Sequence, residues 1–347
     1  MIFESINYKL KNIKPAGIIQ SAVNGFAKIK YVNLVMLLVA LLSAPLLSSC
    51  FSEIEGTQKK ESVYSGINHS GAGFTSDNKY AYYSRSKGSE ANIYLRELDA
   101  TTEISLTSDS SENICVRGSV FGNDILFSSN KTGTFRVYKM ALDGTVPVDI
   151  LRNISYNFID AAFSKNGQFI VFSAVQRTDS NYSQICTADT NGENFKQITS
   201  TDSLKRKPTV SADNTLVMFQ KKVNNNWGLY YVDLLADDKI EQEFLVETNL
   251  DAFDPEFLSS NAQSVKGAEE IIYIHGKVGV SVRMERSYII NKAVKVVKTF
   301  SNYYYFDQPA VSADGSKVLF LQKLLSGNRF DVWKTDLNGT SFGQFSF

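Results

Sequence analysis

Histidine and cysteine are scarce in this chain of 347 residues, which contains two histidines and three cysteines. A metal site usually takes several ligands from histidine, cysteine and carboxylate side chains, and a histidine-dependent nucleophile needs a base held beside it. The two histidines, His69 and His275, lie far apart in the sequence. We therefore predict no catalytic residue, no metal and no cofactor, and we interpret His69 as a loop residue and His275 as a strand-end residue.

An excess of charge of one sign is also absent. Lysine and arginine number 36, as do aspartate and glutamate, so the formal net charge is zero. A balanced chain offers no electrostatic reason to bind nucleic acid, and we expect no nucleic-acid partner. The hydrophobic content of 43% allows a sizeable core. Long helical patterns are missing as well, which favours an all-β protein.

A targeting segment begins the sequence. Lys28 and Lys30 precede an apolar run from Leu34 to Leu47, and small residues follow this run. A basic flank, a short apolar core and small residues before a cleavage point are typical of a secretory signal peptide. The run contains Pro45 and is too short for a comfortable membrane span. We predict that residues 1–49 are a signal peptide. The stretch before Lys28 is long for the basic region of such a peptide, which suggests a start codon downstream of Met1.

The sequence Leu47-Ser48-Ser49-Cys50 resembles the bacterial lipobox, in which the cysteine thiol is diacylated and becomes the mature N-terminus. We predict lipidation of Cys50, because two or three acyl chains at one residue anchor a protein durably. The alternative is a free cysteine beyond an ordinary signal peptide. We interpret residues 50–66 as the lipidated cysteine followed by a polar tether between the lipid and the domain. Phe51 stands where aspartate would favour inner-membrane retention, so we expect the outer membrane if the host is Gram-negative.

From about Ile67 onward the sequence repeats a unit of roughly 45 residues. Each unit contains a strand with an inward-facing aromatic residue, and in every unit except the fifth a turn sequence precedes this strand. Successive aromatic residues are 44, 45, 47, 54 and 47 positions apart, and an insertion at residues 261–270 explains the longer fifth unit. The expected aromatic anchors of the six units are Tyr83, Phe127, Phe172, Phe219, Tyr273 and Phe320.

A third strand follows each anchor, and in three units an Asp-Gly or Asn-Gly turn (Asp143-Gly144, Asn191-Gly192 and Asn338-Gly339) then leads into a short fourth strand. Four short antiparallel strands per period are the signature of a propeller blade. We predict an all-β, six-bladed β-propeller of four-stranded antiparallel blades at residues 67–347, each blade containing its own four strands. Stacking between neighbours covers both apolar faces of a blade. The expected central residues of the third strands are Tyr94, Tyr138, Cys186, Tyr230, Tyr288 and Trp333.

The sixth unit, from Asp307-Gln308-Pro309 to Asp314-Gly315, resembles the D-x-x-P-x-x-S-x-D-G repeat of the TolB-type propeller family. Asp254-Pro255 and Lys207-Pro208 are partial matches in units five and four. The resemblance covers residues 67–347 and implies the fold, although one propeller fold serves many functions. About sixteen residues separate Cys50 from the first unit, so we expect the α/β domain of TolB itself to be missing.

Four further features have structural interpretations. Cys115 and Cys186 are expected on strands that are not neighbours, so we predict two buried thiols rather than the disulfide that an exported protein could form. The aspartates of the Ser-x-Asp-Gly turns are expected to bind backbone N–H groups. Lys205-Arg206-Lys207 is interpreted as a solvated run, with a partner-binding patch as the alternative. Tyr303–Phe306 is interpreted as packing, with a tyrosine on a binding surface as the alternative.

These observations predict a lipid-anchored protein of the bacterial cell envelope that is not an enzyme. Its partners would be the membrane, through the lipid, and a protein or peptide held by loops at one end of the ring or at the mouth of the central channel. The alternative is a carbohydrate-binding or carbohydrate-cleaving propeller, favoured if carboxylates and an arginine converge near the axis. A third hypothesis is a purely structural part of a larger assembly.

Overall fold

A computed structural model describes residues 67–346 except 121, 153, 155, 176–181, 248, 259–268, 278–279, 290, 301–303 and 328. The predicted signal peptide, Cys50, the tether and most of the fifth-unit insertion lie outside these residues. The described part forms strands and no helix, and it therefore contains no helix that could cross a membrane. Residues 66–347 form one compact unit.

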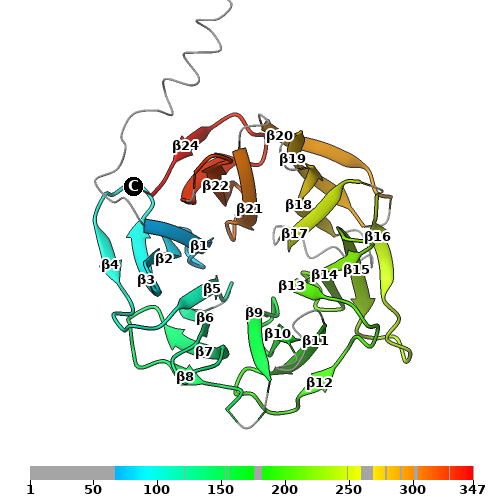
Figure 1. Cartoon of the computed structure of the whole chain (residues 1–347), viewed down its shortest axis with the longest axis horizontal. Helices are drawn as coiled ribbons and strands as arrows, with labels where there is room; N and C mark the ends of the chain where they lie inside the picture. The colour runs from blue at the N-terminus through cyan, green and yellow to red at the C-terminus, as the bar shows by residue number, and fades with distance from the viewer. Residues whose placement is uncertain are drawn as a thin grey trace, which may run out of the picture. The chain divides into compact units, whose positions relative to one another are not determined.

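Six four-stranded antiparallel sheets surround a central axis, and their strands follow sequence order (Figure 1). The innermost strands are β1 (Ile67–Phe74), β5 (Asn113–Gly118), β9 (Asn157–Phe163), β13 (Lys205–Val210), β17 (Asp251–Phe257) and β21 (Tyr304–Val311). The second strands are β2 (Tyr80–Lys87), β6 (Asp124–Ser129), β10 (Phe169–Val175), β14 (Leu216–Val223), β18 (Glu270–Lys277) and β22 (Lys317–Leu324). The third strands are β3 (Glu90–Glu97), β7 (Arg136–Ala141), β11 (Ser183–Asp189), β15 (Asn226–Asp233), β19 (Ser281–Tyr288) and β23 (Asp331–Asp336). The outermost strands are β4 (Glu103–Ser105), β8 (Val148–Asp149), β12 (Lys196–Gln197), β16 (Gln242–Leu245), β20 (Val294–Phe300) and β24 (Phe342–Gln344). The predicted six-bladed all-β propeller is therefore confirmed.

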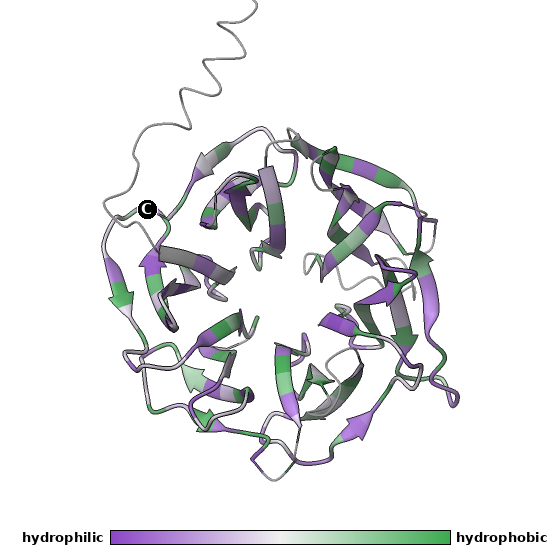
Figure 2. Cartoon of the chain, in the orientation of Figure 1, coloured by the Kyte–Doolittle hydropathy of each residue, from purple (hydrophilic) through white to green (hydrophobic). Residues whose placement is uncertain are grey.

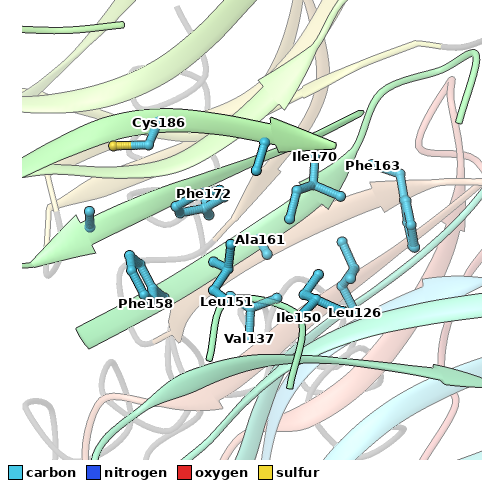
Figure 3. Packing of buried hydrophobic residues seen from close by; sticks show 12 residues of the cluster. Leu126, Val137, Ile150, Leu151, Phe158, Ala161, Phe163, Ile170, Phe172 and Cys186 are labelled. Carbon is cyan, nitrogen blue, oxygen red and sulfur yellow. The ribbon is translucent and has the colours of Figure 1, made fainter. Parts of the chain in front are cut away.

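The six predicted aromatic anchors are all buried, with at most 2% of each residue exposed. They lie on the second strands, and six hydrophobic clusters each join two neighbouring blades. Figure 3 shows one such cluster, which contains Leu126 and Val137 from the second blade together with Phe158, Phe163 and Phe172 from the third. Side chains of alternate strand residues serve opposite neighbours, so the apolar pattern of each strand is explained by stacking.

The predicted central residue of the third strand in the fifth blade, Tyr288, is wrong. Tyr288 is 42% exposed and lies opposite Glu270. The residue opposite the anchor Tyr273 is Glu285, which is buried. The strand β19 (Ser281–Tyr288) thus places Glu285 opposite the anchor, three positions before the residue that the sequence pattern predicts there. This blade thus carries a charged residue where the others have an aromatic residue or cysteine.

Within the described residues, the ring is closed by contacts between the first and last blades rather than by an exchanged strand. Among the described residues, each sheet contains four consecutive strands. A hydrophobic cluster joins the first and last blades through Tyr83 and Phe345. The guanidinium of Arg96 lies 4.5 Å from the Phe345 ring centroid, and the N–H of His69 donates to the carbonyl of Phe330 at 3.2 Å.

The propeller has two distinct faces. The turn face carries the turns between first and second strands, where Ser312 donates to Asp314 at 2.6 Å and Asp314 accepts from the N–H of Ser316 at 2.9 Å. The predicted capping role of the turn aspartates is therefore confirmed. The hairpin face carries the tips that join second and third strands. It also carries Ile67, the first residue of β1, which pairs with Lys87.

Candidate binding site at the mouth of the central channel

Each of the six innermost strands has a register irregularity where it pairs with the second strand of its blade. One residue there adopts a left-handed conformation, as expected of a bulge. These residues, with φ between 50° and 76°, are Gly71, Cys115, Asp160, Lys207, Asp254 and Gln308. The residues two positions later line a cavity that receives side chains from all six blades, and they are Gly73, Arg117, Ala162, Thr209, Glu256 and Ala310. The cavity therefore lies on the propeller axis, at its turn face.

Glu256 is the centre of the polar groups in this cavity. Its carboxylate accepts hydrogen bonds from Arg117, from Nζ of Lys165 at 3.2 Å and from Oγ1 of Thr209 at 3.3 Å. The four residues come from four different blades, and the three charged side chains are at most 17% exposed. The network connects opposite sides of the ring across the axis.

Electrostatics keep this network ionised. Burial alone would raise the pKa of Glu256, but Lys165 and Arg117 together hold that pKa below its usual range. Burial likewise works to lower the pKa of Arg117, and the Glu256 carboxylate outweighs it and raises that pKa. Two cations and one anion give the mouth a net charge of +1.

A second buried charge cluster lies on the same innermost strands. Asp160 on β9 pairs with Arg206 and with Nζ of Lys207 at 3.4 Å, both on β13. Although burial opposes ionisation, these two cations hold the pKa of Asp160 far below its usual range. Asp254 accepts from the N–H of Gln308 at 2.8 Å, and burial raises its pKa. Asp160 is therefore held by ion pairs, whereas Asp254 is held by a backbone N–H group.

Tyr82 brings a hydroxyl group to the mouth through a slot made by two glycines. A Cβ atom at Gly73 would lie 2.3 Å from the Tyr82 hydroxyl oxygen, and one at Gly118 would lie 2.6 Å from it. The N–H of Gly118 donates to this oxygen. Because any larger residue at either position would displace the ring, these glycines are required for the tyrosine to lie between the first two blades.

The cavity has a volume of about 50 Å³. Since a buried water needs about 10–15 Å³ measured in this way, the space holds only a few waters. Pockets for drug-sized ligands have about 300–1,000 Å³. The mouth therefore has room for a single inserted side chain rather than for a whole organic ligand.

The interpretation of Lys205-Arg206-Lys207 as a solvated run is wrong. These residues form the first half of β13, drawn as hydrophilic in Figure 2, and the side chains of Lys205 and Lys207 are 0% and 11% exposed. Lys205 pairs with Glu241 at 3.7 Å, and burial lowers its pKa to about 8. Buried carboxylates on neighbouring segments explain why a lysine-rich run can lie inside the ring.

Both histidines are buried on strands, which corrects their assignment to a loop and to a strand end. Nδ1 of His69, on β1, lies 2.7 Å from the Phe330 carbonyl, and burial lowers its pKa to about 3. Nδ1 of His275, inside β18, lies 3.0 Å from a Glu285 oxygen. Among the described residues, no three histidine, cysteine or acidic side chains lie close enough to hold a metal ion.

Cys115 and Cys186 are free thiols, as predicted, but only Cys186 is buried, whereas Cys115 is partly exposed. Cys186 lies opposite the anchor Phe172 and takes the place of an aromatic residue. Cys115 instead has the left-handed bulge position, which carries no other apolar side chain in the six blades, so its assignment as an apolar substitute is wrong. Burial raises the pKa of Cys115 to about 11 and that of Cys186 to about 12.

The aromatic segment before the sixth unit is largely core, as interpreted. Tyr304 and Phe306 pack in the cluster between the fifth and sixth blades, while Tyr303 lies outside the described residues. Tyr305 is half-buried on the hairpin side, where its ring stacks on Phe253 with centroids 6.4 Å apart.

The family model for the TolB β-propeller domain, PD40, matches residues 50–256, more than half of the chain. The chain belongs to the TolB β-propeller family. The bulged innermost strands followed by Ser-x-Asp-Gly turns are thus the structural form of the repeat noted in the sequence. No curated protein matches the chain significantly.

Several solved structures share this TolB-family fold at low sequence identity. TolB from Acinetobacter baumannii is 14% identical with a TM-score of 0.56, covering 80% of this chain and 63% of that protein. The chain therefore spans less than two thirds of that TolB. A putative TolB from Agrobacterium tumefaciens is 13% identical with a TM-score of 0.55, covering 67% of this chain and 81% of that one. An oligogalacturonate lyase from Vibrio parahaemolyticus is 11% identical with a TM-score of 0.55, and the match covers 82% of this chain and 80% of that one.

The sequence reasoning missed the polar residues at the mouth. It identified Asp254-Pro255 as a partial repeat but gave no role to the next residue, Glu256. A signal was present: when the repeats are aligned, the position of Glu256 carries Arg117 in unit two and small or uncharged residues elsewhere. Opposite charges at one inward position of two blades predict a contact across the axis.

Proposed function

We propose that this TolB-family propeller is a lipid-anchored protein of the bacterial cell envelope, in the outer membrane of a Gram-negative host, and that it binds a protein or peptide partner without catalysing a reaction. The anchor would be Cys50, supported by the lipobox-like sequence before it. The partner would dock on the turn face and insert one side chain into the axial mouth.

The small polar cavity at the mouth carries this proposal. Its lining comes from every blade, so a partner seated there contacts the whole ring at once. Its volume of about 50 Å³ fits one side chain. Its net positive charge and the Tyr82 hydroxyl favour a carboxylate-bearing side chain. Because Glu256 has a pKa below its usual range, it is a weak base at neutral pH, which supports binding over general base catalysis.

A carbohydrate-binding or carbohydrate-cleaving propeller is the second candidate. The observation that favours it is the convergence of Arg117 and Glu256 near the axis, together with the fold shared with an oligogalacturonate lyase. The small volume of the mouth argues against a sugar ring inside it. Binding of the purified protein to a glycan array, or cleavage of an acidic polysaccharide, would support this alternative.

Site-specific photocrosslinking in the native cells tests the docking face. We expect a photoreactive residue at Ser76 or Val120, which line the turn-face cavity, to give a discrete crosslinked protein. Lys131 and Thr132, exposed on the hairpin face at the β6–β7 tip, are the matched control positions. Crosslinking to the same protein from both faces, or from the control positions alone, would contradict the proposed docking face.

A further inference from the structure

The tip of the β22–β23 hairpin exposes two adjacent leucines. Leu324 and Leu325 are 47% and 41% exposed, and the N–H of Gly327 donates to the Leu324 carbonyl at 2.9 Å to close the turn. Lys323 precedes this pair, with Nζ 4.8 Å from the centroid of the Phe330 ring. The tip thus presents apolar side chains beside a cation and an aromatic ring, the composition typical of membrane-interface segments.

The start of the propeller lies beside this tip. Both the N–H and Nδ1 of His69, two residues after Ile67, lie within hydrogen-bonding distance of the carbonyl of Phe330, at 3.2 and 2.7 Å. Seventeen positions separate Cys50 from Ile67. A flexible polar chain of that length has a root-mean-square span of roughly 20–25 Å. A lipid at Cys50 would therefore keep the hairpin face, and this corner of it, close to the bilayer.

A second hairpin tip beside this one also exposes an apolar residue. The neighbouring tip in the fifth blade exposes Val280, at 65%. In contrast, the β2–β3 tip of the first blade is Lys87-Gly88-Ser89-Glu90 and lacks apolar residues. The apolar tips of the fifth and sixth blades are thus adjacent in the ring, next to the point where the chain enters the first blade (Figure 1).

We propose that the β22–β23 tip is a second membrane contact, in which Leu324 and Leu325 enter the lipid interface and Lys323 lies near anionic headgroups. This rests on the proposed lipid anchor, which brings the tip to the bilayer. The contact orients the propeller with its hairpin face toward the lipid and its turn face, with the axial mouth, away from it. Apolar side chains gain free energy by leaving water, and lysine is attracted to the anionic surface.

Tryptophan fluorescence on vesicles tests this contact. The chain beginning at Cys50 is coupled through that thiol to a maleimide lipid in vesicles of phosphatidylethanolamine and phosphatidylglycerol. Cys115 and Cys186, the free cysteines of the described residues, are replaced by alanine in all variants so that coupling goes to Cys50. We expect the Leu325→Trp variant to show a blue shift and strong quenching by brominated lipids, after subtraction of the parent signal.

Val146→Trp is the matched control, because Val146 is an 84% exposed residue in the turn-face loop between β7 and β8. Its emission should be unchanged by brominated lipids. Equal responses of the two variants, or no quenching at position 325, would overturn the proposal. A concentration-dependent dimer abolished by Leu325→Ser would also overturn it, because a second copy would then cover the tip.

The chemical tether separates this proposal from the proposed function. Coupling by maleimide holds the chain on the vesicle whether or not Cys50 is acylated in cells. Mass spectrometry of the native N-terminus decides acylation independently. Quenching at position 325 without native acylation would leave the contact standing and remove the natural anchor. Native acylation without quenching would overturn the contact alone.

Discussion

Replacing Gly192 by alanine is expected to destabilise the propeller by more than about 4 kcal/mol, or to prevent folding. Gly192 has φ +86° in the turn between β11 and β12, and a Cβ atom there would lie 1.5 Å from the carbonyl oxygen of Ile150 in the preceding blade. The left-handed conformation costs alanine about 1–2 kcal/mol. The overlap with a neighbouring backbone adds to this, because the carbonyl cannot move without shifting a whole blade edge.

Gly133→Ala is the matched control for this measurement. Gly133 has φ +90°, and a Cβ atom there would meet nothing within 4 Å. The loss of unfolding free energy in this variant should be limited to the conformational strain of about 1–2 kcal/mol. Chemical denaturation of both variants measures the difference. Equal losses of unfolding free energy would contradict the conclusion that the turns of one blade pack tightly on the edge of the next.

Glu256→Gln is expected to lower the unfolding free energy by about 3–5 kcal/mol, because Arg117 and Lys165 would remain buried without a carboxylate. The pH dependence follows from the same contact. Since the pKa of Glu256 is lowered in the folded state, its stabilisation is present above the ordinary glutamate pKa and is lost as the pH falls through the folded value. The variant should therefore lose less stability than the parent on acidification.

Lys131→Met provides a surface reference. Nζ of Lys131 lies 3.7 Å from Asp109 in a pair whose side chains are 53% and 31% exposed. Exposed pairs contribute about 0–1 kcal/mol, so this variant should be nearly neutral. If Glu256→Gln were equally neutral, the network across the axis would not be a stabilising contact of the ring.

The fold could be predicted because its signals are local. Phe172 and Phe320 occur at similar positions of repeats whose strands pair with their sequence neighbours, so spacing and turn residues were sufficient. The error at Tyr288 has a physical reason. The buried position opposite Tyr273 is occupied by Glu285, whose carboxylate pairs with His275 and Arg283. Because this residue is charged, the pattern of apolar residues in the sequence does not identify it.

The candidate site could not be predicted because its contacts are not local. Arg117 and Glu256 are 139 residues apart, and only closure of the ring brings them together. The same is true of Asp160 and Lys207, which lie on adjacent innermost strands of different blades. Charged residues with buried partners look like surface residues in a sequence, which is why the sequence alone predicts a solvated run at Lys205-Arg206-Lys207.

Metabolic palmitate labelling of the wild type and of Cys50→Ala, with membrane fractionation and crosslinking in both strains, tests the central claim most directly. The claim is that a TolB-family propeller is held at the membrane to bind a partner. We expect label and membrane retention in the wild type, with loss of both and of the turn-face crosslink in the variant. A wild-type protein that carries no label and fractionates like the variant would contradict the lipid anchor.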